Sequence, residues 1–272
     1  MKTRLLSFLA FVFLVTAVGC TSVVNTAVDS TVNRAAERTG EVVGERIGEA
    51  AGAMIVARFP DTWTTQWTNL YTGYLFNIAF GAGNYSVTED AYAPGEYTRW
   101  QMLENDEPTG AYIRRAFLAR TDEGNEWWHV TYENAETDEA IILEGLFSPN
   151  QEELLRLRGQ FPGEEAKEMP VEEGTYGYTQ PRTLSPESIE GATVGTETIS
   201  VPAGSFEAQH VRYGTPGATL EWWMDDDVPG ALVKYLRRAD SGSDDAERST
   251  PASWVVELES YGDDAESELG VL

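Results

Sequence analysis

Residues 193–201 and 206–213 read TVGTETISV and FEAQHVRY, two short runs rich in β-branched and aromatic residues that flank Pro202-Ala203-Gly204. Such runs are typical of strands, and turn residues between them predict a hairpin loop. Similar runs continue outward on both sides, from residue 63 to residue 261, with turn residues between them. This spacing indicates consecutive antiparallel strands and not alternating βαβ units.

The chain beyond residue 58 therefore predicts a mainly β (α+β) domain over residues 59–272. We expect a curved antiparallel sheet or half-barrel with covering helices, preceded by a long N-terminal helix. The candidate strands are Gly73–Phe80, Tyr97–Glu104, Ala111–Ala119, Glu126–Tyr132, Ala140–Phe147, Thr193–Val201, Phe206–Tyr213, Thr219–Met224, Leu232–Arg238 and Trp254–Tyr261.

One helix is predicted to interrupt these strands. Ser148 and Gln151 form a capping-box pattern around Pro149, three leucines follow, and Gly159 ends the segment. Residues 160–192 contain four prolines and many carboxylates, so we expect a long loop there.

A resemblance supports the predicted sheet. Its residues are 196–208, then Trp222-Trp223-Met224, Val228-Pro229-Gly230 and Leu232-Val233-Lys234. They resemble a hairpin and a following strand pair of bacterial envelope proteins that are similar to the LolA/LolB lipoprotein-carrier superfamily. The resemblance covers about 45 residues and implies a curved antiparallel half-barrel closed by helices around an apolar cavity. It implies no site residues, because the shared motifs record turns and strands.

The N-terminus predicts export. Lys2 and Arg4 precede the apolar residues 5–18, and Ala17-Val18-Gly19 leads into Cys20, the only cysteine. This is the pattern of a signal peptide over residues 1–19, and its apolar run is too short to span a bilayer. Residues 17–20 resemble the lipobox of bacterial lipoproteins, which implies that Cys20 carries lipid. Ordinary signal peptidase would also accept Ala17 and Gly19, and it would leave a free thiol.

Lipidation implies a membrane-attached protein. Several acyl chains make attachment effectively permanent, and no second hydrophobic span follows. In the lipoprotein sorting pattern, an Asp after the cysteine retains the protein in the inner membrane. Thr21 stands at that position, so we expect the outer membrane, with the chain facing the periplasm.

Residues 20–58 predict a lipidated N-terminus and a Gly-rich helical stalk, because apolar residues recur at helical spacing from residue 23. Within it, a four-residue repeat places Gly40, Gly44, Gly48 and Gly52 along one side. Glycines in a helix interior cost about 1 kcal/mol each, and small residues at this spacing permit close helix packing. Two interpretations remain: the glycines dock a partner helix, or they merely loosen a flexible stalk.

Two candidate strands contain tandem tryptophans, Trp127-Trp128 and Trp222-Trp223. Neighbours on a strand point to opposite faces, so each pair places a large aromatic ring on both sides of the sheet. These rings either pack in a core or line an apolar ligand cavity, as curved sheets and barrels often provide.

The charge excludes nucleic acid as a partner. The chain of 272 residues carries 45 acidic and 19 basic residues, a net charge of −26, and its longest basic clusters are Arg pairs. Either a local acidic site binds cations or the whole surface suits a salty, halophilic setting. Asp225-Asp226-Asp227 is the best cation candidate, but it lacks the alternating spacing of a calcium loop, so we expect no metal and no cofactor.

No catalytic motif is present. The sequence lacks HExxH, GxSxG, a P-loop and a strand-linked GxGxxG. His129 and His210 fall within predicted strands, where packed histidines are common. We therefore expect a lipid-anchored envelope protein and not an enzyme. We expect it to bind an apolar ligand, such as a lipid or an acyl chain, in its half-barrel. The alternative is a structural lipoprotein that docks an envelope partner through its Gly-repeat helix. A hydrolase would need one of these histidines to meet a carboxylate in an open cleft.

Overall fold

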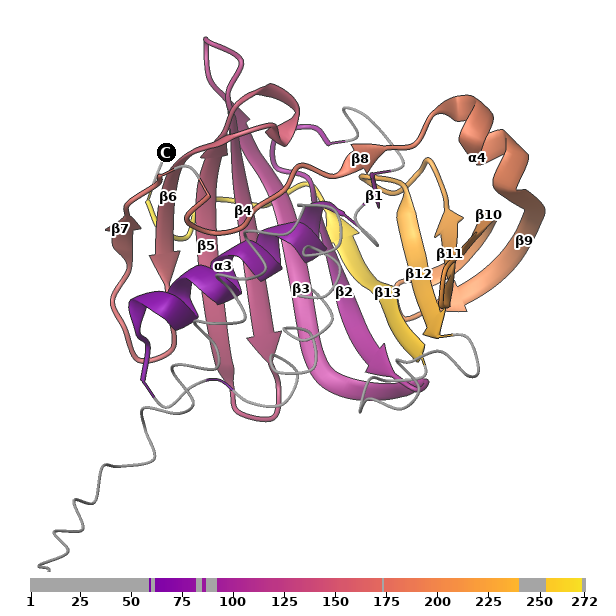
Figure 1. The fold of residues 1–272 in the computed structure, drawn as a ribbon, viewed down its shortest axis with the longest axis horizontal. Helices are drawn as coiled ribbons and strands as arrows, with labels where there is room; N and C mark the ends of the chain where they lie inside the picture. The colour runs from indigo at the N-terminus through magenta and orange to yellow at the C-terminus, as the bar shows by residue number, and fades with distance from the viewer. Residues whose placement is uncertain are drawn as a thin grey trace, which may run out of the picture. The chain divides into compact units, whose positions relative to one another are not determined.

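The computed structural model describes residues 59, 62–81, 85–86, 92–172, 174–239 and 253–270. The predicted signal peptide, Cys20 and the glycines of the repeat at positions 40–52 lie outside these residues. Two α-helices and one large sheet dominate the described part (Figure 1).

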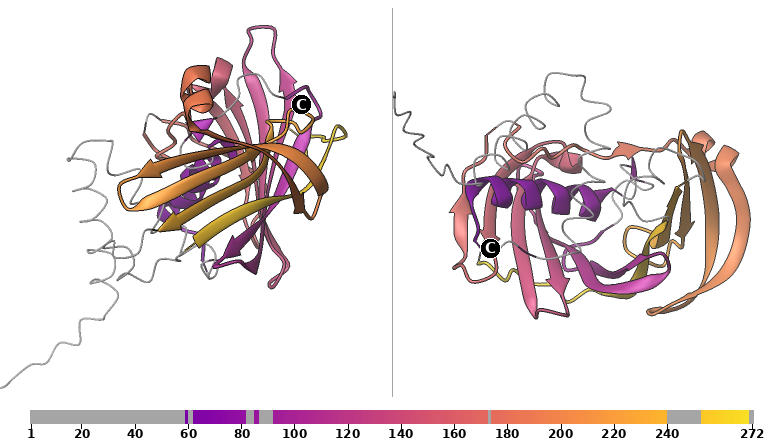
Figure 2. Two further views of the ribbon diagram at one scale, coloured as in Figure 1. Left: turned by 90° about the vertical axis from the view of Figure 1, so that its right-hand side faces the viewer. Right: turned by 60° about the horizontal axis from the view of Figure 1, so that its bottom comes forward.

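Eleven strands form this sheet, and every neighbouring pair is antiparallel. Their order across the sheet is β7-β6-β5-β4-β3-β2-β13-β12-β11-β10-β9, so β7 and β9 are its edges. The sheet is curved and unclosed, which confirms the predicted mainly β class (Figure 2). The strands are β2 (Tyr97–Glu104), β3 (Glu107–Arg120), β4 (Glu126–Asn134), β5 (Glu139–Phe147), β6 (Leu154–Gln160), β7 (Lys167–Met169), β9 (Thr193–Val201), β10 (Gly204–Thr215), β11 (Ala218–Met224), β12 (Leu232–Ala239) and β13 (Ser253–Gly262).

The chain builds the sheet as two meanders. Strands β2 to β7 follow one another outward to one edge, and β9 to β13 run from the other edge inward. The final strand, β13, pairs with β12 on one side and with β2 on the other. The first and the last strand of the sheet in chain order, β2 and β13, therefore pair with each other and join its two halves.

The predicted hairpin is present. Val201 faces Gly204 in the β9–β10 register, which leaves Pro202 and Ala203 as a two-residue loop. Every predicted strand from Tyr97 onward coincides with or lies within an observed strand.

The predicted strand Gly73–Phe80 is wrong, because this segment belongs to helix α3 (Thr65–Phe80). The Thr64 hydroxyl caps it by accepting from the Trp67 N–H at 3.4 Å. α3 lies across one face of the sheet, which we call the inner face (Figures 1 and 2). Its Phe76 ring meets Phe147 of β5 edge-on at 5.1 Å.

The predicted helix from Ser148 to Gly159 is also wrong. Pro149–Gln151 form a single 3₁₀ turn, and the leucines that follow belong to β6. The Ser148 hydroxyl accepts from the Glu153 N–H at 2.8 Å, so the capping signal closes a turn and not a helix. β6 then pairs with β5 and β7, which satisfies its backbone within the sheet.

The predicted loop of residues 160–192 contains β7 and two further elements. Strand β8 (Arg182–Thr183) pairs in parallel with β1 (Tyr85–Ser86). Helix α4 (Pro186–Ala192) follows and runs directly into β9 (Figure 1).

The main core lies on the inner face, where α3 packs against β3 and β4, and it continues into β9 to β12. Two smaller clusters lie on the opposite, outer face, one around Trp127 and one around Trp223. After β13, the C-terminal segment, residues 263–270, reaches the outer face, where the Ala265 N–H donates to the Gly95 carbonyl at 2.9 Å.

Candidate functional site

His129 lies on the outer face of β4, and its side chain is 0% exposed. Its Nδ1 is 3.2 Å from Glu144 Oε1 of the neighbouring strand β5, and its Nε2 is 2.6 Å from the Thr131 hydroxyl. The C-terminal segment closes over this pair. The Ser267 hydroxyl donates to Glu144 Oε2 at 2.8 Å, and the Glu268 N–H donates to Oε1 at 2.7 Å.

These donors set the charge of Glu144. Burial by itself would raise the pKa of this carboxyl, but hydrogen bonds from His129, Ser267 and the N–H groups of Leu269 and Glu268 outweigh it. The pKa of Glu144 therefore lies below its ordinary value, and the group is an anion whose partners are all in place.

His210 of β10 forms a second network on the outer face. Its Nε2 is 2.8 Å from Glu221 Oε2, and its Nδ1 is 3.1 Å from Glu197 Oε1. Its ring stacks on Trp223 at 4.4 Å, and the Trp223 indole N–H donates to Glu197 at 2.6 Å. Arg212 donates to Glu221 at 2.8 Å. The network ties β9, β10 and β11 together.

Each histidine therefore meets a carboxylate, as a hydrolase would require, but in a closed setting. His129 is fully buried and the His210 side chain is 8% exposed. Both side chains have their ring nitrogens within reach of protein oxygens. This arrangement supports a packing and bonding role, since an acid–base group must reach the proton that it transfers.

The tandem tryptophans divide between the two faces, as strand alternation predicts. Trp128 belongs to the inner core and lies 5.3 Å from Phe80 of α3, while Trp127 packs in the outer cluster. Trp222 belongs to the inner core, and Trp223 packs outside against His210. All four are at most 9% exposed, so their rings are engaged in packing.

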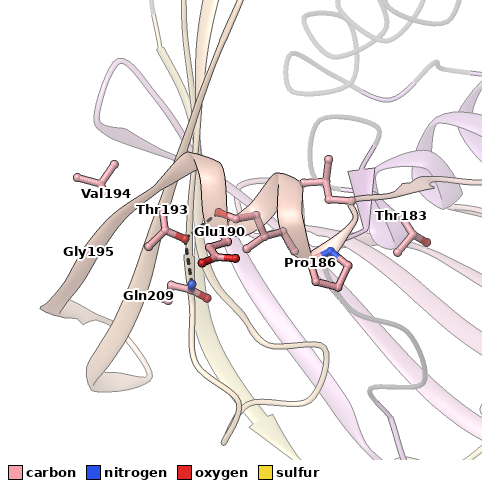
Figure 3. A pocket seen from close by; sticks show the side chains of 9 residues that line it. Thr183, Pro186, Glu190, Thr193, Val194, Gly195 and Gln209 are labelled. Atoms are coloured by element: carbon pink, nitrogen blue, oxygen red, sulfur yellow. Dashed lines mark hydrogen bonds between the residues drawn. The ribbon is translucent and has the colours of Figure 1, made fainter.

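A pocket opens elsewhere, between α4 and the start of β9 (Figure 3). Its volume is about 820 Å³, which is within the range of ligand sites. Apolar side chains of α4, β9 and the preceding segment provide much of its wall. Its lining residues are Thr183, Leu184, Pro186, Ile189, Glu190, Thr193, Val194, Gly195 and Gln209.

Two hydrogen bonds hold the wall of this pocket. The Thr193 hydroxyl donates to the Ile189 carbonyl at 2.8 Å and accepts from the Gln209 amide at 3.0 Å. Figure 3 shows the side chains of Glu190, from α4, and Gln209, from β10, in the wall of the pocket. Val194, at the pocket's edge, is 56% exposed. The pocket is thus fixed by α4 and β10, with one apolar side chain presented to solvent.

Sequence reasoning missed this pocket, although a signal for α4 is present. The Ser185 hydroxyl caps the helix by accepting from the Ser188 N–H at 3.2 Å, with Pro186 in the first turn. Ser-Pro followed by Glu187 is a helix-start pattern. The surrounding prolines and carboxylates conceal it.

The remaining candidates from the sequence are the acidic triplet at positions 225–227, Cys20 and the glycine repeat. Asp225-Asp226-Asp227 forms a turn in which Asp225 Oδ1 accepts from the Asp227 N–H at 3.0 Å. In the described part of the chain, no group of three or more acidic, His or Cys side chains has metal-binding geometry. No helix there is long and apolar enough to cross a membrane. Cys20 and the glycines at positions 40, 44, 48 and 52 are outside the described residues.

No protein-family model matches the chain, and no curated protein matches it. Among solved structures, the chain is similar to an exported protein with a YmcC-like fold from Bacteroides fragilis, at 10% identity and a TM-score of 0.31. It is also similar to a lipoprotein from Parabacteroides distasonis, at 11% identity and a TM-score of 0.30. Each match covers 62% of this chain and 96% of the other. TM-scores of this size do not establish a shared fold, and the LolA/LolB resemblance stays a prediction.

Proposed function

We propose that this chain is a non-catalytic, lipid-anchored protein of the bacterial cell envelope whose β domain binds an apolar group in the pocket between α4 and β9. The observation that carries the proposal is this pocket at the rim of the sheet. It is bordered by Leu184, Ile189 and the exposed Val194. Apolar pockets with a few polar groups are the usual form of small-ligand sites.

The non-catalytic part rests on the two histidines. His129 and His210 are held within closed networks of Glu, Thr and Trp side chains. The lining of the pocket includes Glu190 but neither histidine. A single exposed carboxylate beside Thr and Gln is suited to binding polar or cationic groups near an apolar one.

Binding is tested with N-phenyl-1-naphthylamine, a neutral dye that fluoresces in apolar sites. We expect a saturable signal with the full chain. Val194→Asp should weaken it roughly tenfold, equivalent to about 1.4 kcal/mol, because it places a charge at the pocket's edge. Leu155→Asp is the matched control, since Leu155 is 41% exposed on β6. Equal loss in both variants, or no signal at all, would refute the pocket.

Anchoring is tested separately. Cys20→Ala should release the chain from sedimented membranes and abolish labelling by radioactive palmitate. Thr21→Asp is the matched variant, because the sorting pattern then places the lipidated chain in the inner membrane. Separation of the two membranes on a density gradient distinguishes these results. Unchanged labelling of Cys20→Ala would exclude this cysteine as the anchor.

The glycine repeat favours a second candidate function, docking of a partner helix. Gly44→Leu and Gly48→Leu should then abolish self-association or capture of a purified partner, because a bulky side chain prevents close backbone approach. Ala35→Leu in the same predicted helix is the control. Unchanged sedimentation of all three variants would favour the flexible stalk.

A further inference from the structure

The two edges of the sheet differ. β7 is an edge of three residues followed by Pro170, and its Lys167 adds a charge. Short edges with Lys and Pro resist pairing with another chain. β9 is an edge of nine residues without Lys or Pro, and most of its residues are exposed. It is the edge that remains able to pair.

The hairpin fixes which backbone groups of β9 are available. Val201 and Gly204 are register partners that close the two-residue loop. In such a hairpin the closing residues are a hydrogen-bonded pair, and these pairs alternate with non-hydrogen-bonded ones along an antiparallel ladder. The N–H and C=O groups of Thr196, Thr198 and Ser200 therefore point away from β10. Within the described part of the chain, no strand pairs with that side of β9.

The free edge ends at the pocket. A register shift between His210 and Val211 leaves Val194 without a partner on β10. Val194 and Gly195 then form part of the pocket wall beside Ile189 of α4. A strand laid along residues 196–200 arrives at this pocket and can place its terminal side chain in it. Backbone pairing for affinity and a side-chain pocket for specificity are the two parts of strand-addition sites.

The charge of the residues around β9 and the pocket favours one kind of added strand. Residues 183–211 contain four glutamates and neither Lys nor Arg. A second copy would bring the same glutamates, and like charges across a strand pair destabilise it. A basic segment would place its charges near Glu190 and Glu197. Charge complementarity therefore favours a different protein over a second copy.

We propose that β9 binds an extended, basic segment of another protein as a twelfth strand, with an apolar side chain of that segment in the pocket beneath α4. This rests on the proposed function of the pocket and names the class of its ligand. The added strand continues the sheet beyond β9 and covers Thr196, Thr198 and Ser200.

The probe is the peptide Leu-Lys-Thr-Lys-Thr-Lys-Leu with blocked ends, which carries Leu at both ends because the edge accepts either strand direction. Hydrogen exchange of the full chain, measured by NMR, reports the amides of Thr196, Thr198 and Ser200. We expect all three to gain protection when the peptide is added. We also expect binding to weaken as salt rises.

Two controls isolate backbone pairing. A peptide that is N-methylated at alternate residues keeps charge and side chains but loses donors, and it should bind roughly tenfold more weakly or not at all. Thr198→Pro removes one edge N–H of the protein without removing a β9–β10 hydrogen bond, and it should have the same effect. Thr198→Val should bind as the unaltered chain does.

Several results would overturn the proposal. Equal binding of the N-methylated peptide, or protection that does not appear at these amides, would exclude strand addition. Equal binding of a peptide with Glu in place of Lys would exclude the basic partner. Protection of the same amides without peptide, together with a concentration-dependent rise in sedimentation, would identify a second copy as the occupant. If the naphthylamine binds but the peptide does not, only this inference fails.

Discussion

Glu144 attaches the C-terminal segment to the outer face of the sheet, and its lowered pKa makes this attachment pH-dependent. An ionised Glu144 stabilises the fold above the ordinary carboxyl pKa of 4.5, and this contribution is lost as pH falls through the lowered pKa. We expect Glu144→Gln to reduce the free energy of unfolding at neutral pH by about 2 kcal/mol. Its stability should also fall less steeply on acidification.

Urea unfolding at neutral and acidic pH measures both effects. Glu153→Gln is the control, because Glu153 is an exposed acidic residue in the turn before β6. The same acid dependence in Glu144→Gln and the unaltered chain would show that another group controls it.

At the scale of single residues, the sequence predicts which face of the sheet a side chain occupies but not which side chain it contacts. The alternation of strands assigned Trp127 and Trp128 to opposite sides correctly. It could not pair His129 with Glu144, because the pairing depends on strand register. Nor could it bring Ser267 to Glu144, because that contact joins residues far apart in the chain.

At the scale of elements, α3 depends on Gly73. A Cβ at this position would lie 1.6 Å from the Tyr176 carbonyl oxygen. We expect Gly73→Ala to destabilise the domain by on the order of 3 kcal/mol, because backbone must move to admit the methyl group. Thermal or urea unfolding measures the change.

Gly191 of α4 is the matched control, since a Cβ there meets nothing within 4 Å. Gly191→Ala should be neutral or stabilise by up to about 1 kcal/mol through its higher helix propensity. Equal destabilisation by both substitutions would contradict the close contact at Gly73.

Burial explains why the sequence of residues 73–80, the second half of α3, predicts a strand. Residues 71–76 are all buried, so the helix has no single apolar stripe to reveal its period. Its aromatic and apolar residues then imitate a buried strand, for which periodicity gives no distinction. The prediction for β6 is wrong in the opposite sense, because its sequence predicts a helix and it forms a strand. Leu154 and Leu157 are both buried, with exposed Leu155 between them, and this spacing imitates a helical face.

The pocket was outside the reach of sequence patterns for a related reason. β9 and its hairpin were predicted correctly, but α4 is short and has no buried residue. A helix of this kind leaves no apolar period. Its position over β9 and Gln209 depends on tertiary contacts such as that of Ser188 with Tyr213, whose hydroxyl groups are 2.9 Å apart.

At the scale of the whole molecule, charge is the dominant property. Removal of residues 1–19 takes away Lys2 and Arg4, so the mature chain would carry 17 − 45 = −28. We predict that the purified protein loses strand signal in circular dichroism when salt is lowered to the millimolar range, because screening of mutual repulsion is lost. Sucrose at matched osmolality is the control. Full structure at low salt would leave the acidic excess without this explanation.

The position of β13 has a consequence for the order of folding. The chain is synthesised from its N-terminus, yet the strand that joins the two meanders is the last to emerge. Until then β2 and β12 each expose an unpaired edge, which is a template for aggregation. The two meanders can form early, but the continuous sheet must wait for residues 253–262. A chain interrupted before Ser253 would therefore retain most of its strands and have no route to one sheet.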